Sequence, residues 1–193
     1  MIKLTTPISD EDIRKLKVGD EVFLSGTIVT ARDEAHKLMV EETPEFIREY
    51  LDGSVIYHCG PVVKQDDMGE WSFVSAGPTT SAREEPYQAT VMCEYNVKGV
   101  IGKGGMGDKT SEGLSRCGGV YFHAVGGAGT LIANSVKKVK KVFKLEEFGT
   151  PEAFWVIDVK DFPLVVTMDS HNKSIHKEIR EKSEKKAEEL YKR

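Results

Sequence analysis

Hydrophobic and polar positions along this chain repeat with two different periods. Residues 21–31 (EVFLSGTIVTA) are rich in β-branched and aromatic side chains and predict a strand. Residues 31–42 place Ala35, Leu38 and Met39 at helical offsets and predict a helix. The same criteria predict further strands at 54–59, 70–76, 97–102, 120–125, 154–159 and 163–169, and helices at 44–50, 84–95, 111–117 and 128–136.

Strands and helices alternate through residues 97–136, which is typical of βαβ units with parallel strands. The segments before and after are richer in strands, so we predict one α/β domain with a mixed sheet over residues 1–172. Residues 173–193 contain no Gly or Pro and mix charges at helical spacing, which predicts a charged C-terminal helix. We favour a solvated surface for this helix over a basic, partner-binding one.

The chain has 193 residues and a formal net charge of −4. The balance of hydrophobic and charged residues in the sequence is too apolar for a disordered chain and too polar for a membrane protein. The first residues, MIKLTTPISDEDIRK, do not resemble a signal peptide, and the mild acidity argues against nucleic-acid binding. We therefore expect a cytoplasmic protein with no membrane or nucleic-acid partner. A run of lysines between 137 and 144 is interpreted as a solvated face.

Three cysteines, Cys59, Cys93 and Cys117, stand at wide spacings. Their number is odd and no CxxC pair occurs, so we predict neither a disulfide framework nor a metal site. Cys93 is expected to be a core thiol and Cys117 a turn thiol. The five histidines are scattered, and neighbours such as His58 and Cys59 face opposite sides of a strand, which argues against zinc.

Three glycine-bearing loops follow predicted strands, at 75–83, 101–110 and 124–130. Loops at the carboxyl ends of strands form the ligand crevice of α/β sheets, and glycine lets the backbone approach a ligand. Three such loops favour an anion site over tight turns alone. Residues 102–107 match GxGxxG by letter, but 120–133 lack the acidic residue that a dinucleotide site needs, and there is no Walker A motif.

Charged and hydroxyl side chains stand in or beside these strand-end loops. Arg32 follows a predicted strand, Lys103 lies between glycines, and Thr79 precedes Arg83 by four residues. If a helix starts after Pro78, Thr79 and Arg83 share one side of it. Two arginines and a lysine in one crevice suit a small dicarboxylate, because guanidinium groups bind carboxylates bidentately. Taken singly, each charged residue is also compatible with a surface salt bridge.

Several segments together resemble one family, the β subunit or C-terminal domain of class I fumarate hydratase and L(+)-tartrate dehydratase. The resemblance runs in order from about residue 3 to about residue 170. The segments that carry it are KLTTPIS (3–9), LSGTIVTARDEAHK (24–37), IYHCGPVV (56–63), SAGPTTSAR (75–83), GVIGKGGMG (99–107) and PEAFWVIDVKDFPLVV (151–166).

The resemblance implies a swivelling β/β/α domain that acts with an α subunit in a hetero-oligomer. The α subunit would hold a [4Fe–4S] cluster, this chain would bind no metal, and fumarate would be reversibly hydrated to (S)-malate. By the same resemblance, Arg32 and Arg83 would bind the dicarboxylate, while Thr79 and Lys103 would be catalytic. Because the chain starts with its own Met where the family's β portion begins, we expect a separate subunit.

One position departs from the family pattern. The family commonly reads SARMEPY, whereas residues 81–87 read SAREEPY, so Glu84 stands where Met is usual. Two alternatives to fumarate hydratase stay open. The first is the β subunit of L(+)-tartrate dehydratase, which shares these motifs, and the second is a non-catalytic, anion-binding regulatory module.

Overall fold

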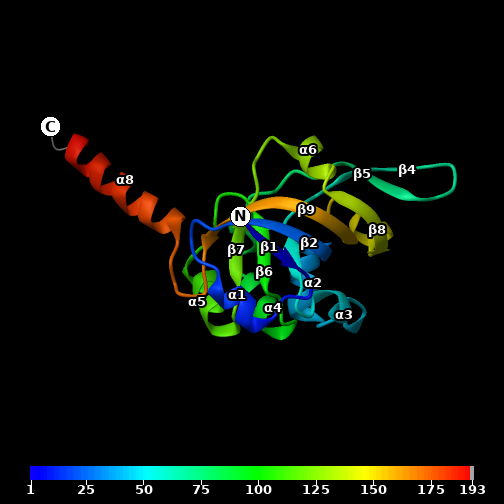
Figure 1. Ribbon diagram of the computed structural model, residues 1–193, viewed down its shortest axis with the longest axis horizontal. Helices are drawn as coiled ribbons and strands as arrows, with labels where there is room; N and C mark the ends of the chain where they lie inside the picture. The colour runs from blue at the N-terminus through cyan, green and yellow to red at the C-terminus, as the bar shows by residue number, and fades with distance from the viewer. Residues whose placement is uncertain (192–193) are drawn as a thin grey trace.

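The computed structural model describes residues 1–191, so the last two residues of the predicted C-terminal helix lie outside the described part of the chain. It combines helices with a mixed sheet, as the sequence predicts (Figure 1). In chain order the elements are β1 Ile2–Thr5, α1 Asp10–Lys15, β2 Glu21–Thr30, α2 Asp33–Glu41, the 3₁₀ helix η1 Glu45–Ile47, α3 Arg48–Leu51, β3 Val55–Tyr57, β4 Val62–Gln65, β5 Trp71–Ser75, the 3₁₀ helix η2 Ser81–Glu84, α4 Gln88–Glu94, β6 Gly99–Gly102, α5 Asp108–Cys117, β7 Val120–His123, α6 Gly129–Ala133, β8 Val136–Phe143, α7 Leu145–Phe148, β9 Phe154–Met168 and α8 Ile175–Tyr191.

The main sheet closes on itself. Strands β2, β3, β6 and β7 are parallel neighbours in that order. Strand β9 then pairs antiparallel with β7 on one side and with β2 on the other, which completes the ring. Strands β1 and β8 add to the ring outside it, β1 on β2 and β8 on β9. The parallel order of β6, α5 and β7 confirms the βαβ unit expected at 97–136.

Strand β9 is one long strand where the sequence predicts two, at 154–159 and 163–169. Its pairing with β2 shifts register between Leu24 and Gly26, opposite residues 159–162. Asp161 has a φ of 51° at this point. The inward positions are odd-numbered up to Val159 and even-numbered from Phe162 to Val166. The bulge therefore interrupts the alternation that a sequence pattern detects without ending the strand.

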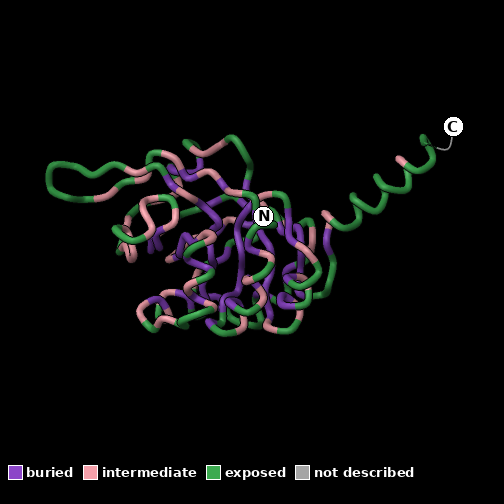
Figure 2. The backbone as a smooth tube through the Cα atoms, turned by 180° about the vertical axis from the view of Figure 1, so that it is seen from behind, coloured by how far each residue is buried: buried purple, intermediate pink, exposed green. Residues whose placement is uncertain are grey.

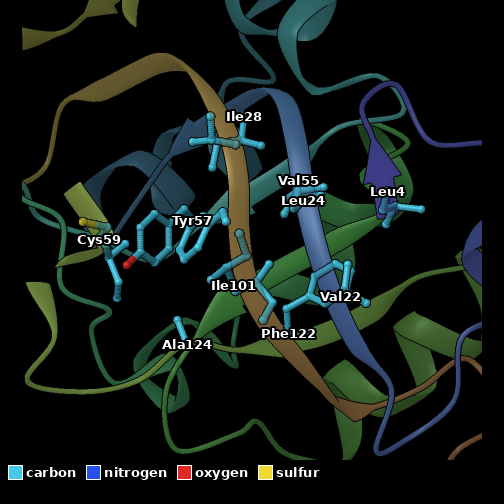
Figure 3. Packing of buried hydrophobic residues seen from close by; sticks show 14 of the residues in the cluster. Leu4, Val22, Leu24, Ile28, Val55, Tyr57, Cys59, Ile101, Phe122 and Ala124 are labelled. Carbon is cyan, nitrogen blue, oxygen red and sulfur yellow. The ribbon is translucent and has the colours of Figure 1, made fainter. Parts of the chain in front are cut away.

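Side chains that point into the ring form the first hydrophobic core. Figure 3 shows Leu24, Ile28, Tyr57, Ile101 and Phe122, from four different strands, directed toward one another. Successive residues of each strand face opposite sides, so these positions alternate with residues that point outward. Burial of these large apolar side chains fixes the register of the parallel strands, and with it the place where each strand ends.

The outward face of the parallel strands is covered by helices α2, α3, α4 and α5, with a second hydrophobic core between them (Figure 1). Helices α4 and α5 pack closely, because a Cβ on Gly113 would lie 2.9 Å from the Cβ of Ala89. Gly118 follows the last residue of α5 and caps the helix, with a φ of 70° in the left-handed region that glycine favours. The helical layer thus covers one side of the sheet and leaves the strand ends free.

The lysine-rich run that we interpreted as a solvated face is strand β8 at the edge of the sheet. Its lysines are exposed, whereas Val136, Val139 and Val142 are partly buried against the first core. The apolar residues recur every third position because the pairing with β9 shifts register twice, between Val136 and Lys138 and between Val139 and Lys141. Each bulge adds one residue to β8, so the alternation of inward and outward side chains that marks a strand is not visible in the sequence.

Two segments project from the body of the molecule (Figure 1). One is the hairpin of β4 and β5, and the other is α8, which is largely exposed along its length (Figure 2). The first turn of α8 is anchored by His176, whose Nε2 lies 2.9 Å from Thr167 Oγ1, and by the ion pair Lys177–Asp108 at 3.0 Å. Within residues 1–191, no helix has both the length and the apolar character needed to cross a membrane. The division into a domain over 1–172 and a separate helix remains a prediction.

The prediction for two of the cysteines was wrong. Cys93, in the last turn of α4, and Cys117, the last residue of α5, form a disulfide with a Cα–Cα distance of 5.3 Å. Wide sequence spacing gave no sign of this pair, because the close packing of α4 on α5 brings the two helix ends together. Cys59 is free and buried.

Gly26, at the register shift within β2, gives a prediction about how β2 packs against the segment after β1. Its φ is +103°, and an added Cβ would meet Thr6 Oγ1 in addition to lying 3.0 Å from Thr6 O. Gly19 has a similar φ of +96° but no atom within 4 Å of an added Cβ. We expect Gly19→Ala to lower the free energy of unfolding by roughly 1–2 kcal/mol from backbone strain alone. Gly26→Ala should lower it by roughly 1–3 kcal/mol more, because of the added overlap. Urea unfolding curves measure both, and equal losses would contradict the packing described here.

The disulfide gives a second prediction. Alkylation of the denatured, unreduced protein, followed by mass spectrometry, should modify one thiol, and prior reduction should raise this number to three. Reduction should lower the free energy of unfolding by about 3 kcal/mol, because the bond closes a loop with a sequence separation of 24. A Cys93→Ser variant should no longer respond to reductant. Three reactive thiols before reduction would exclude the bond.

Candidate functional site

The parallel strands β2, β3, β6 and β7 all end at the same rim of the ring, and the loops that follow them gather there. The three glycine-bearing loops meet at this rim, as expected. Ala76 N–H donates to Gly129 O at 3.0 Å, and Ala124 N–H donates to Gly102 O at 2.9 Å. An added Cβ on Gly77 would lie 3.7 Å from the Cα of Gly129, so the two backbones approach closely.

Thr79 lies between the ends of β3 and β6. Its backbone N–H donates to His58 O at 2.8 Å, and its carbonyl accepts from Lys103 N–H at 3.2 Å. Ser81 N–H then donates to Lys103 O at 3.1 Å, so residues 79–81 run parallel to the end of β6. The backbone therefore brings together Thr79 and Lys103, the two residues predicted to be catalytic.

The predicted helical start after Pro78 was wrong. Residues 79 and 80 are extended, and the 3₁₀ helix η2 begins only at Ser81. The offset of four between Thr79 and Arg83 is therefore not a helical one. Neighbouring residues in extended backbone face opposite ways, so Thr79 and Thr80 still differ in orientation. Thr79 is partly buried and its hydroxyl donates to His58 O at 3.1 Å, whereas Thr80 is exposed.

Arg32 comes directly before α2 and lies over the loop after β3. An added Cβ on Gly60 would be 3.2 Å from Arg32 Cδ, so Gly60 makes room for this side chain. Arg32 Nη1 lies 3.3 Å from Glu152 Oε1, and both side chains are only 19% exposed. The neighbouring Cys59 pairs with Pro78, which places Arg32 next to the segment that carries Thr79.

Arg83 is placed differently from the other three. It forms an ion pair with Asp33, the first residue of α2, and its side chain is 60% exposed. Because Asp33 follows Arg32 directly, this ion pair holds Arg83 to the start of α2, next to Arg32. A shared dicarboxylate site for the two arginines stays a prediction.

Lys103 extends from the end of β6 across the loop after β7, where an added Cβ on Gly126 would lie 3.6 Å from its Cδ. Within residues 1–191, no carboxylate forms an ion pair with Lys103. Its loop is held by Glu85, which accepts from Gly107 N–H at 2.7 Å and from the Thr110 hydroxyl at 2.7 Å. The Lys103 charge is therefore available to an anion.

Below these side chains lies a buried polar network that sequence reasoning did not identify. His36 Nε2 and His58 Nε2 lie 3.0 and 2.8 Å from the same Gln88 side-chain oxygen. His58 Nδ1 lies 2.8 Å from Ser81 Oγ, which lies 2.8 Å from the Tyr121 hydroxyl. Burial lowers the pKa of His36 to about 4 and that of His58 well below its usual value. No spacing rule links these residues, because they lie on α2, η2, α4, β7 and the loop after β3.

The site as a whole combines positive charge with one hydroxyl. Arg32, Lys103 and Thr79 are partly buried and Arg83 is exposed, so the surface is open to solvent. Guanidinium and ammonium groups bind carboxylates, and a hydroxyl beside them can take part in proton transfer. Within residues 1–191, no group of three or more His, Cys, Asp or Glu side chains could hold a metal ion. The chemistry that fits is the binding of a small dianion.

The chain is similar in sequence to several named proteins. The chain is 49% identical over 183 residues to a protein of Geobacillus stearothermophilus provisionally named fumarate hydratase class I, and spans 35% of that longer protein. It is 44% identical to a provisionally named L(+)-tartrate dehydratase subunit beta of Methanocaldococcus jannaschii, and covers 95% of it. It is 40% identical to the L(+)-tartrate dehydratase subunit beta of Escherichia coli K12, and covers 85% of it. In each comparison the match includes 89% or more of this chain.

The family model described as Fumarase C-terminus matches residues 1–179. This range contains every strand of the ring, all four predicted site residues and the buried network below them. The chain therefore belongs to the Fumarase C-terminus family.

Proposed function

We propose that this chain is the β subunit of a class I fumarate hydratase, which reversibly hydrates fumarate to (S)-malate. The observation that carries the proposal is the backbone link between Thr79 and Lys103, beside Arg32, at an open rim of the sheet. The relative with 49% identity is named as a fumarate hydratase, which supports fumarate as the substrate.

The partner in this proposal is an α subunit that carries a [4Fe–4S] cluster. The residues of this chain do not fit such a cluster, since Cys93 and Cys117 are bonded to each other and Cys59 is buried. Burial raises the pKa of the Cys59 thiol to about 12. When bound in the partner, a cluster with an open iron supplies Lewis-acid activation of the substrate. The names of two relatives as beta subunits support a hetero-oligomer.

The proposed roles follow from the positions of the side chains. Arg32 and Arg83 bind and orient the two carboxylates, and Lys103 offsets the negative charge that develops on the substrate. The Thr79 hydroxyl donates to His58 O at 3.1 Å before reaction. In the hydration direction it would give its proton to one substrate carbon while a water molecule adds its hydroxide to the other. The positive charge of Lys103 would stabilise the resulting alkoxide until the remaining proton of that water restores the hydroxyl. Because this surface is open to solvent, a partner is required to exclude water. A cytoplasmic location remains a prediction from the sequence.

L(+)-tartrate dehydratase is the second candidate, because two relatives with that name match nearly the whole length of this chain. Both reactions remove or add water at a small dicarboxylate, so the same arginines and lysine serve either substrate. A non-catalytic, anion-binding module is the third possibility from the sequence, and the assay of the complex distinguishes all three.

The assay uses the chain alone and the chain mixed with its cluster-loaded α subunit, both without oxygen. The chain alone should bind no stoichiometric iron and show no turnover. The mixture should turn over fumarate with a higher kcat/KM than L(+)-tartrate. Higher efficiency with tartrate would favour the dehydratase. Turnover by the metal-free chain alone would contradict the two-subunit proposal, and no turnover by the complex would favour the binding module.

Thr79 provides a sharper test of the mechanism. Thr79→Val in the complex should lower kcat by roughly 10²-fold or more, because a positioned acid–base group is lost. Thr79→Ser should recover much of the activity, because it restores the oxygen. Thr80→Val is the matched control, since Thr80 is exposed and faces the other way. Melting curves should be nearly unchanged for all three variants, and full kcat in Thr79→Val would show that the threonine is structural.

A further inference from the structure

Glu84 is a buried carboxyl group next to the arginines that we propose bind substrate. It is the last residue of η2, and its side chain is 1% exposed. Glu85, the next residue, accepts hydrogen bonds from the loop before α5, so η2 is held between that loop and α2. A carboxyl group buried this fully calls for a physical role.

One oxygen of Glu84 is left without a partner. Within residues 1–191, Glu84 Oε2 is buried and accepts no hydrogen bond. In the described part of the chain, the one basic nitrogen within 4.0 Å of this carboxylate is His36 Nδ1, at 3.8 Å. That nitrogen already lies 2.9 Å from Arg32 O, and since a carbonyl oxygen only accepts, His36 Nδ1 carries the proton of that hydrogen bond. Glu84 therefore receives no hydrogen bond that would stabilise its ionised form.

His36 does not supply a positive charge to Glu84. Burial keeps the pKa of His36 at about 4, so the ring is neutral near pH 7. With its proton on Nδ1, a neutral His36 must accept at Nε2, and the group facing it at 3.0 Å is the Gln88 side-chain amide. The amide meets His58 in the same way, at 2.8 Å. We assign the NH₂ group of Gln88 to this position, where its two protons can reach both imidazoles.

The remaining charges near Glu84 come from three elements. Arg32 and Asp33 stand at the start of α2, Arg83 precedes Glu84 in η2, and Glu152 lies before β9. The pKa of Glu84 is raised to about 7, chiefly by burial and additionally by the negative charge of Glu152, while the positive charges of Arg83 and Arg32 limit the rise. Glu84 thus changes charge near neutral pH, and the cations that respond to it are the two arginines.

We propose that Glu84 is a positioning residue, which controls through its charge how strongly Arg32 and Arg83 hold a dicarboxylate substrate. This inference rests on the proposed function. As a neutral acid, Glu84 leaves both guanidinium groups to the substrate. As a carboxylate, it competes with the substrate for the same two groups and repels the dianion. Neither state requires contact between Glu84 and the substrate.

The direction of the pH dependence follows. A bound dianion disfavours ionised Glu84, so binding raises its pKa, and affinity is highest below pH 7 and falls as the pH rises through 7. For a coupling of one pKa unit, KM for fumarate rises roughly fivefold between pH 6 and pH 8. The effect falls on KM and leaves kcat unchanged, because Glu84 does not touch the reacting atoms.

The test compares KM and kcat for fumarate at pH 6 and pH 8 in the complete complex. Glu84→Gln keeps the shape of the neutral acid, so its KM should stay near the low-pH value of the parent at both pH values. Glu84→Met, with the residue common in the family, should behave in the same way. Glu41→Gln on α2 is the control, since Glu41 is exposed, and it should keep the pH dependence of the parent. Melting curves of all variants verify that they are folded.

A second measurement separates this inference from the proposed function. The carboxyl carbon of Glu84, labelled with ¹³C and assigned by its loss in Glu84→Gln, should titrate in NMR spectra with a midpoint near pH 7. A midpoint below pH 5 overturns the inference even if the complex hydrates fumarate. The same pH dependence of KM in parent and Glu84→Gln also overturns it. If Glu84 titrates near pH 7 but the complex turns over neither fumarate nor tartrate, the proposed function fails, and the role of Glu84 in substrate binding fails with it.

Discussion

The antiparallel pairing of β2 with β9 is the interaction on which the rest of the structure depends. Without it the sheet would be open, with β1 and β8 at its two edges. With it, β2, β3, β6, β7 and β9 form a ring whose interior is filled by large apolar side chains. The ring holds the parallel strands in one register, so their carboxyl ends form a single rim. The bulge opposite Leu24 and Gly26 lets β9 contact β2 along nearly its full length despite the curvature.

The candidate site is built on this rim by backbone contacts rather than by side chains alone. Thr79 is hydrogen-bonded to the end of β3 and to the end of β6 at the same time, so it cannot move without disturbing both strands. The imidazoles of His36 and His58, joined by Gln88, fill the space below with buried polar groups. The charged side chains of the site are therefore supported on their buried side by this network and remain accessible to solvent on the other side. A domain of this kind supplies one side of a binding site, which accords with its proposed place in a two-subunit enzyme.

Sequence reasoning succeeded where local pattern and tertiary structure agree. The run of β-branched residues in β2 and the alternation through β6, α5 and β7 predicted those elements, and the glycine loops predicted where they would meet. It failed where three-dimensional packing changed the local rule. Bulges hid the strand period in β8 and divided β9 into two apparent strands, and the contact of α4 with α5 paired Cys93 with Cys117. Thr79 was grouped with Arg83 by a helical offset, whereas its neighbours in the structure are His58 and Lys103. Glu84 drew notice only as a departure from a family motif, because its burial depends on residues distant in sequence.

Strand β8 affects how readily copies of this chain can aggregate. A strand at the edge of a sheet exposes unpaired backbone groups, onto which another chain can add a strand and begin to aggregate. Here that edge carries Lys137, Lys138, Lys140 and Lys141, all exposed, and two bulges that interrupt a regular ladder. If the β8 edges of two copies paired, the lysines of one copy would face the lysines of the other. The bulges would also prevent a regular ladder of hydrogen bonds. The strand thereby disfavours edge-to-edge addition of a second copy of this chain.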